Sequence, residues 1–167
     1  MSILSSNTIQ EITKLKSRYP DDRQKSALLP ALHLAQAEQG WLPVQAMDEV
    51  AEVLDIQPIE VYEVATFYTM FHVKKVGKFV IEVCRTGPCC TVGAEEFVQY
   101  MEEKLNIKVG ETTEDGLITL KTVECLAACG TGPVLQIGPE YIYQENMTKK
   151  KFDDLIEELK IKGLKDV

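Results

Sequence analysis

Four of the five cysteines in this sequence form two pairs that could bind a metal ion or cluster. Cys84 and Cys89, the first pair, have the spacing C-x4-C, and Cys125 and Cys129, the second pair, have the spacing C-x3-C. Four convergent thiolates can hold a structural zinc ion, a [4Fe–4S] cluster or a [2Fe–2S] cluster, in which each iron takes two thiolates. An odd number of cysteines in a chain with no export signal argues against a disulfide scaffold.

The residues around the pairs favour an iron–sulfur cluster over zinc. Small residues fill the run 127–133 around Cys129, and the first pair encloses Gly87 and Pro88. Small residues let backbone N–H groups approach the cluster sulfurs, which stabilises the anionic site. A helix predicted to begin near Thr91 would point its positive end toward Cys89 and lower the thiol pKa. Zinc stays open as the alternative.

Cys90 is left outside the two pairs. We interpret it as a packing residue, because C-x4-C already completes the first pair. An additional ligand or a redox-reactive thiol is the alternative. A thiol–disulfide oxidoreductase is disfavoured, since the x4 spacing does not match the C-x-x-C motif of that class.

Residues 1–76 have apolar positions at helical spacing in four segments. Gly40 is a helix stop, and Pro43 and Pro58 favour helix starts. Short links between such helices are typical of a compact bundle. We therefore predict an N-terminal four-helix domain over residues 1–76, with helices at 7–18, 22–39, 44–54 and 58–71.

After residue 76 the pattern changes to short β-rich runs. The order of elements predicts a thioredoxin-like α/β domain over residues 77–167, so the fold class of the whole chain is α+β. Its strand ends could bring both cysteine pairs to one edge of the sheet. We expect a trans bond before Pro133. The predicted elements are strands at 79–83, 117–120, 134–137 and 141–143, and helices at 91–105 and 148–159.

Charge and hydropathy exclude several functional classes. The 167 residues carry a net charge of −8 and a pI of about 4.9, with no basic stripe, which argues against nucleic acid as a partner. No apolar run approaches the ~18 residues that a membrane span needs. Residues 1–6 lack the basic and hydrophobic regions of an export signal. We expect a cytoplasmic protein without a membrane span of its own.

The sequence has no pattern typical of a catalytic centre. We find no nucleophile–base pair, no phosphate loop, no carboxylate dyad and no Gly-rich βα turn of a dinucleotide site. We therefore predict no catalytic residue, and no binding of NADH or FMN by this chain alone.

Both cysteine motifs, together with residues 31–36, 61–71 and 109–116, resemble a known family over about residues 7–160. This family is the thioredoxin-like [2Fe–2S] subunit, the 24 kDa subunit, of NADH:quinone oxidoreductase (respiratory complex I). The resemblance places the four cluster ligands on Cys84, Cys89, Cys125 and Cys129. It also implies one [2Fe–2S] cluster, a helical bundle beside the thioredoxin-like domain, and a larger partner subunit that binds FMN and NADH. Two departures are Cys90, where an apolar residue is expected, and Ala127, where the family has glycine.

By this resemblance, the chain would be an electron-transfer subunit that exchanges single electrons with the FMN of its partner. The two would form a heterodimer within a larger assembly that is peripheral to the inner membrane through other subunits. An equivalent diaphorase subunit of an NAD-linked hydrogenase or formate dehydrogenase is the first alternative, and a zinc-stabilised scaffolding module is the second. The aromatic stripe of Tyr62, Phe67, Tyr68 and Phe71 is interpreted as helix core, with docking against the flavin subunit as the other interpretation.

Overall fold

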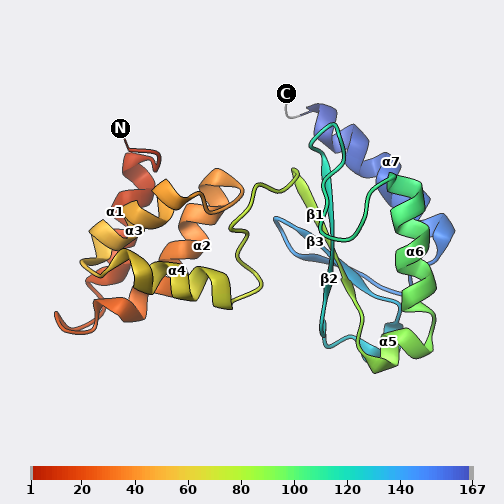
Figure 1. Cartoon of the computed structure of the whole chain (residues 1–167), viewed down its shortest axis with the longest axis horizontal. Helices are drawn as coiled ribbons and strands as arrows, with labels where there is room; N and C mark the ends of the chain where they lie inside the picture. Colours follow the sequence, from red (N-terminus) through yellow and green to blue (C-terminus); the bar gives the residue numbers. More distant parts are fainter. Residues whose placement is uncertain (1, 166–167) are drawn as a thin grey trace. The chain divides into compact units, whose positions relative to one another are not determined.

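The computed structural model describes residues 2–165 and divides into two compact units, Met1–Lys75 and Val76–Val167. The first unit is helical, and the second combines a sheet with helices (Figure 1). Within residues 2–165, no helix is both long and apolar enough to cross a membrane.

The helical unit contains four α-helices and one 3₁₀ turn, and local signals set their ends. The Ser5 hydroxyl caps the first helix by accepting a hydrogen bond from the Thr8 N–H at 3.2 Å. Gly40 (φ 77°) and Asp55 (φ 56°) end the second and third helices in the left-handed region. The elements are α1 (Ser6–Lys16), η1 (Gln24–Ala27), α2 (Leu28–Gln39), α3 (Val44–Leu54) and α4 (Pro58–Phe67).

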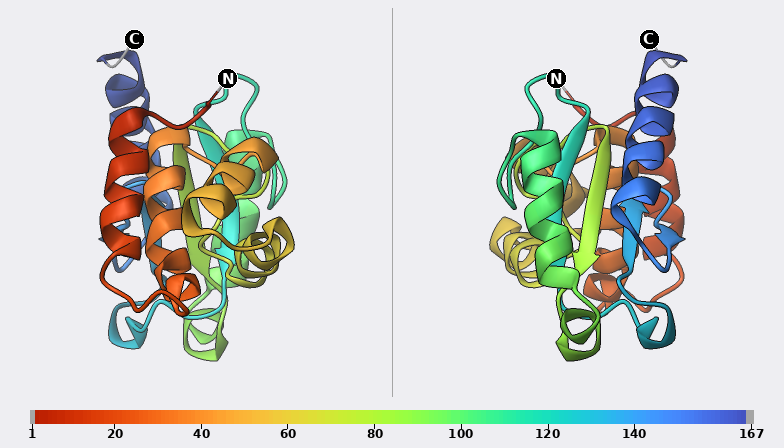
Figure 2. Two further views of the ribbon diagram at one scale, coloured as in Figure 1. Left: turned by 90° about the vertical axis from the view of Figure 1, so that its left-hand side faces the viewer. Right: turned by 90° about the vertical axis from the view of Figure 1, so that its right-hand side faces the viewer.

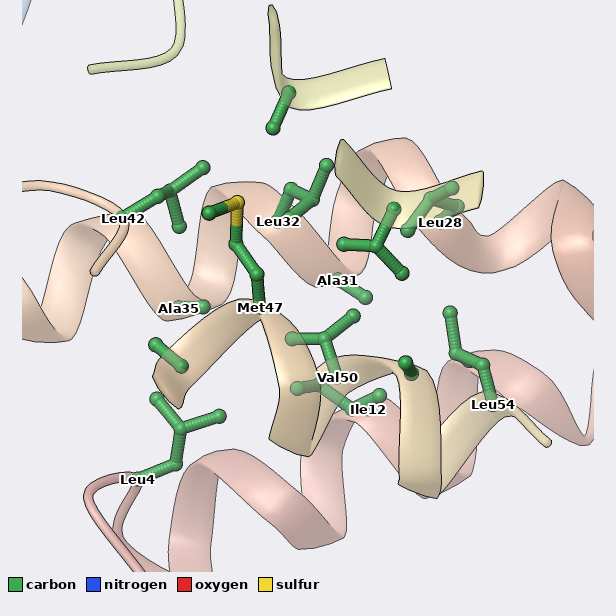
Figure 3. Close-up of a cluster of buried hydrophobic side chains, with 14 of the residues drawn as sticks. Leu4, Ile12, Leu28, Ala31, Leu32, Ala35, Leu42, Met47, Val50 and Leu54 are labelled. Atoms are coloured by element: carbon green, nitrogen blue, oxygen red, sulfur yellow. The ribbon is translucent and has the colours of Figure 1, made fainter. Parts of the chain in front are cut away.

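Aliphatic side chains of α1, α2 and α3 form the core of the helical unit (Figure 3). Leu32 of α2, Val50 of α3 and Ile12 of α1 are fully buried there. This core contains no residue of the second unit. Its burial holds the four helices together, because short helices are marginal in water without such packing.

The aromatic stripe of the sequence is only partly buried. The helix expected over residues 58–71 ends at Phe67, because Tyr68 takes an extended conformation (φ −88°, ψ 116°). Phe71 is buried, but Phe67 is 77% exposed and Tyr68 is 38% exposed. The interpretation of the stripe as helix core is therefore wrong for Phe67 and Tyr68, whose rings contact each other edge to face.

Glu49 of α3 fastens the start of the chain to the helical unit. Its carboxylate accepts hydrogen bonds from the N–H groups of Ile3 (2.7 Å) and Leu4 (3.0 Å) and from the hydroxyl of Ser2 (2.9 Å). Burial raises the pKa of Glu49, but these hydrogen bonds outweigh it and hold the pKa below its usual value. A carboxylate whose folded pKa is depressed stabilises the fold above its unfolded pKa, and loses this effect as the pH falls through the folded pKa.

We expect Glu49→Gln to lower the free energy of unfolding of the helical unit by about 1–2 kcal/mol at pH 7, because the amide presents a donor to groups that are themselves donors. Chemical denaturation at several pH values measures this difference. It should shrink as the pH falls through the depressed pKa of Glu49 and disappear once the wild-type carboxyl is itself protonated. Glu52→Gln, at an exposed position of the same helix, is the control and should change little. A Glu49 effect that persists unchanged at low pH would contradict this account.

The second unit is built on a four-stranded sheet with the order β2-β1-β3-β4. Strands β1 and β2 are parallel, and the pairs β1–β3 and β3–β4 are antiparallel. Two long helices cover one face of the sheet (Figure 2), and their apolar side chains share its core. The elements are β1 (Phe79–Cys84), α5 (Gly87–Thr91), α6 (Ala94–Leu105), β2 (Ile118–Val123), η2 (Cys129–Thr131), β3 (Leu135–Gly138), β4 (Ile142–Gln144) and α7 (Lys149–Lys165).

The helix expected over residues 91–105 begins later, as α6 at Ala94, and a separate short helix, α5, comes before it. Gly93 takes the left-handed conformation (φ 91°), which ends the one-turn helix α5, and α6 begins at Ala94. Cys89 therefore lies inside α5, and the expected dipole of a long helix directed at it from Thr91 is wrong. The bond between Gly132 and Pro133 is cis, which corrects the expectation of a trans bond.

Candidate metal centre

Two parallel strands bring both cysteine pairs to the same end of the sheet. Cys84 is the last residue of β1 and lies opposite Val123, the last residue of β2. The first cysteine loop, residues 84–94, and the second cysteine loop, residues 123–134, therefore leave the sheet side by side. Figure 1 shows α5 of the first loop at this end of the sheet.

The first pair is buried and its two thiols interact. Cys84 is 2% exposed and Cys89 is 1% exposed. Burial raises the pKa of Cys84, but hydrogen bonds from Thr86, Leu126 and Cys89 outweigh it and lower the pKa overall. Burial, together with the hydrogen bond and negative charge of Cys84, raises the pKa of Cys89 to about 11. The two thiols are therefore linked in their titration: a negative charge on Cys84 makes Cys89 harder to deprotonate.

The second pair is exposed and lies on a loop whose backbone groups make specific hydrogen bonds. The Cys125 Sγ accepts a hydrogen bond from the Ala127 N–H at 3.3 Å, which is the kind of N–H to sulfur contact that small residues allow. The buried side chain of Leu126 anchors the loop, and the hydroxyl of Tyr143 on β4 donates to the Leu126 carbonyl at 3.0 Å. Sequence reasoning missed Tyr143, since nothing in its spacing connects it to the cysteines.

Ala127 stands in a conformation that favours glycine. Its φ is +56°, in the left-handed region, where an L side chain costs about 1–2 kcal/mol. The departure from glycine at this position therefore has an energetic consequence. The alanine keeps the N–H that contacts Cys125 and stores strain in the loop.

We expect Ala127→Gly to stabilise the second unit by about 0.5–1 kcal/mol, because the relief of strain exceeds the entropy that glycine adds to the unfolded chain. Thermal unfolding of the full chain measures the gain. Ala128→Gly is the matched control, since Ala128 has a φ of −116° and should lose stability instead. Equal effects of the two substitutions would show that the left-handed backbone is not the cause.

The two cysteine loops contact each other at Gly132. A Cβ on Gly132 would lie 2.9 Å from Val92 Cγ2 and 3.4 Å from Cys89 Sγ. The Cys84 N–H also donates to the Val134 carbonyl at 3.1 Å. The second loop is therefore packed tightly against the buried pair, and a side chain at position 132 would force Val92 to shift.

We expect Gly132→Ala to displace the second loop from Cys89. The amount of cluster that the chain retains should fall by about tenfold, which is at the low end of the effects known for residues that orient metal ligands. Gly130→Ala is the control, because a Cβ at Gly130 meets nothing within 4 Å. Iron content after anaerobic purification is the measurement. Retention of wild-type iron by Gly132→Ala would refute the close packing.

The donor set suits a cluster that takes its ligands in pairs. Among residues 2–165, no three His, Cys, Asp or Glu side chains converge closely enough to hold one metal ion. Instead, Cys84 and Cys89 interact directly, and the charge of Cys129 acts on Cys89. A [2Fe–2S] cluster needs two thiolates on each iron, which the buried first pair and the exposed second pair can supply. The residues therefore fit such a cluster.

Cys90 makes a contact outside this pairing. Its Sγ donates to the carbonyl of Arg85 at 3.1 Å, and burial, together with the negative charges of Glu95 and Cys84, raises its pKa. This contact fixes the backbone of the first cysteine loop. The role of Cys90 as a packing residue stays a prediction, because the side chain is only half-buried.

Arg85 and Glu124, which sequence reasoning did not single out, join the two loops. The Arg85 guanidinium donates to Glu124 Oε1 from Nη2 at 2.9 Å and from Nε at 3.3 Å. The signal was available: Arg85 follows Cys84, Glu124 precedes Cys125, and a parallel register of the two strands places them next to each other.

Comparison with known proteins identifies one matching family model and several relatives that span most of the chain. A family model described as thioredoxin-like [2Fe–2S] ferredoxin matches residues 12–160. The chain is 46% identical over 153 residues to an NADH-quinone oxidoreductase subunit of Rickettsia felis, and the match covers 91% of this chain and 89% of that protein. It is 44% identical over 148 residues to an NADH-quinone oxidoreductase subunit of Rhizobium meliloti, with coverages of 89% and 86%.

A solved structure shares the fold at lower sequence identity. A chain of an NAD⁺-reducing [NiFe]-hydrogenase in the air-oxidized state superposes with a TM-score of 0.71 and 21% identity. The match covers 81% of this chain but only 23% of the hydrogenase chain. At this identity the likeness concerns the fold alone.

Proposed function

Because this chain belongs to the thioredoxin-like [2Fe–2S] ferredoxin family, we propose that it is an electron-transfer subunit of an NADH:quinone oxidoreductase. Family membership confirms the predicted α+β fold class and the [2Fe–2S] cofactor. The relatives that span most of the chain are oxidoreductase subunits by name, which supports the same role here.

We further propose that the two cysteine pairs hold the cluster. The observation that carries this proposal is the parallel register of β1 and β2, which starts both cysteine loops from one end of the sheet. The direct contact between the first two thiols and the packing of Gly132 against Cys89 support it. The proposed ligands are Cys84, Cys89, Cys125 and Cys129.

The residues of this chain set the surroundings of the cofactor. When bound, a [2Fe–2S] cluster supplies reversible transfer of one electron. The buried first pair keeps water from one side of the site, while the exposed second pair leaves the other side open to a partner. The Ala127 N–H directs a hydrogen bond to Cys125, and such contacts stabilise negative charge on sulfur.

We propose that the partner is a subunit that binds FMN and NADH, as the resemblance implies. The sequence has no Gly-rich βα turn for a dinucleotide, so the hydride chemistry would belong to that partner. The exposed rings of Phe67 and Tyr68 on the helical unit contact each other, and adjacent exposed apolar side chains of this kind would suit a protein partner. The two subunits would form a heterodimer in a larger assembly.

The alternative of a diaphorase subunit in an NAD-linked hydrogenase has weaker support. The hydrogenase likeness concerns only the fold, whereas relatives at 44–46% identity are named as subunits of the quinone oxidoreductase. We propose that any attachment to the inner membrane comes through other subunits, with this chain on the cytoplasmic side.

Purification of the full chain from its native host, followed by identification of the proteins that accompany it, tests this function. We expect a flavoprotein subunit to co-purify, and we expect NADH to reduce the cluster only when that subunit is present. Reduction of the isolated chain by NADH, or co-purification with a hydrogenase or a formate dehydrogenase alone, would overturn the proposal.

A further inference from the structure

We propose that Arg85 and Glu124 form a positioning pair, which ties the two cysteine loops together and sets the charge beside the cluster. This inference rests on the proposed cluster site. It concerns two residues that are not proposed ligands: Arg85, which follows Cys84 within the C-x4-C spacing, and Glu124, which precedes Cys125. Their side chains join the first cysteine loop to the second at 2.9 Å.

Backbone contacts show how closely this pair is connected to the ligands. The Arg85 N–H donates to the Val123 carbonyl at 3.0 Å, and Cys84 Sγ lies 3.2 Å from the carbonyl oxygen of Glu124. The Cys90 thiol holds the Arg85 carbonyl from the other side. Both members of the pair therefore have backbones bonded within the two loops, Arg85 directly after Cys84 and Glu124 directly before Cys125.

The pair is too exposed to matter for overall stability. The side chains of Arg85 and Glu124 are 59% and 75% exposed, and ion pairs at such positions contribute little to folding. Its effect is instead local, because both contacts of the guanidinium go to one carboxylate oxygen across the two loops. The shorter contact is a charge-assisted hydrogen bond, which is directional and so favours one arrangement of the two side chains.

Charge gives the pair a second role. Arg85 is the only basic residue in residues 84–94 and 123–134, in a chain with a net charge of −8. Reduction adds a negative charge to an anionic cluster, so a nearby guanidinium favours the reduced form and raises the reduction potential. Glu124 has the opposite effect. Removal of the Arg85 charge and removal of the Glu124 charge should therefore shift the reduction potential in opposite directions. Either removal breaks the same contact between the two loops.

A pair that only held the loops together would change cluster retention and leave the potential unchanged, so both quantities are measured. The experiment uses the full chain carrying its cluster, and follows the potential by an EPR-monitored redox titration and cluster loss by visible absorbance in the presence of a chelator. We expect Arg85→Gln to lower the potential and Glu124→Gln to raise it. Each should lose the cluster about tenfold faster than the wild type, at the low end for residues that orient metal ligands.

The double variant and a distant pair complete the test. The variant that carries both Arg85→Gln and Glu124→Gln should have a potential near that of the wild type. It should lose the cluster no faster than either single variant, because the same contact is broken in all three. Both single shifts should shrink at high salt, since the charges are exposed. Lys160→Gln, which breaks the exposed pair of Lys160 with Glu157 on α7, is the control and should change neither readout.

Shifts of the two single variants in the same direction, or wild-type potential and retention in both, would overturn this inference. A wild-type chain that takes up no cluster would instead overturn the proposed site on which the inference rests. The two failures are therefore distinguishable.

Discussion

Replacing Cys84 by serine is expected to remove most of the cluster from the purified chain. Cys84 is 2% exposed, ends β1 and contacts both Cys89 and the backbone of the second cysteine loop. A serine oxygen is a weaker ligand for iron than a thiolate, and the buried position leaves no room for water to replace it. We expect retained iron to fall by at least about tenfold, a larger effect than the loss of a residue that only orients a ligand.

Cys90→Ser is the matched control for this substitution. Its hydroxyl can still donate to the Arg85 carbonyl, so the first cysteine loop keeps its conformation and the EPR spectrum should stay nearly the same. Serine at Cys89, Cys125 or Cys129 should act like serine at Cys84. Loss of the signal in the Cys90 variant alone would contradict the assignment of ligands.

The second large effect is expected from Phe152→Ala on α7. Phe152 is fully buried, and its ring packs edge to face against Phe97 (5.8 Å between centroids) and near Tyr100 (6.3 Å). Removal of a buried phenylalanine costs about 3–5 kcal/mol. This is a large share of the ~5–15 kcal/mol that stabilises a typical domain. The second unit should therefore unfold at a much lower denaturant concentration and release its cluster.

We propose that the two units are separate domains, with the boundary near residue 76, and the same experiment tests this. Their cores contain no residue in common. Cluster absorbance reports the second unit, and fluorescence of Trp41, the single tryptophan, reports the helical unit. Phe152→Ala should shift only the absorbance transition, and Leu32→Ala, at a fully buried position of the helical unit, should shift only the fluorescence. A joint shift of both transitions in each variant would contradict separate domains.

Sequence patterns predicted the helices and strands best where local signals mark both ends. Helix α3 begins after Pro43 and ends before Asp55, and it matches the predicted residues 44–54. The helix expected over residues 91–105 was right in its end at Leu105 and three residues early in its start, because apolar spacing does not reveal the left-handed backbone of Gly93 before Ala94. The exposure of Phe67 could not be predicted either, since residue type alone does not reveal whether a helix face has a partner within the chain.

The sequence predicted two cysteine pairs that could bind a metal centre, but it did not predict the residues that support them. Spacing left zinc and an iron–sulfur cluster open, and the four ligands, which the resemblance implies, stay a prediction. The opposite exposures of the two pairs depend on how the loops fold onto the sheet. The contacts of Arg85, Glu124 and Tyr143 join residues far apart in the chain, so only the strand register and the hairpin bring them together.

The most direct test of the central claim is EPR spectroscopy of the full chain, purified without oxygen and chemically reduced. A single [2Fe–2S] cluster held by the two cysteine pairs predicts a signal that appears on reduction and integrates to about one unpaired electron per chain. A chain that stays EPR-silent after reduction and contains one zinc ion would contradict it.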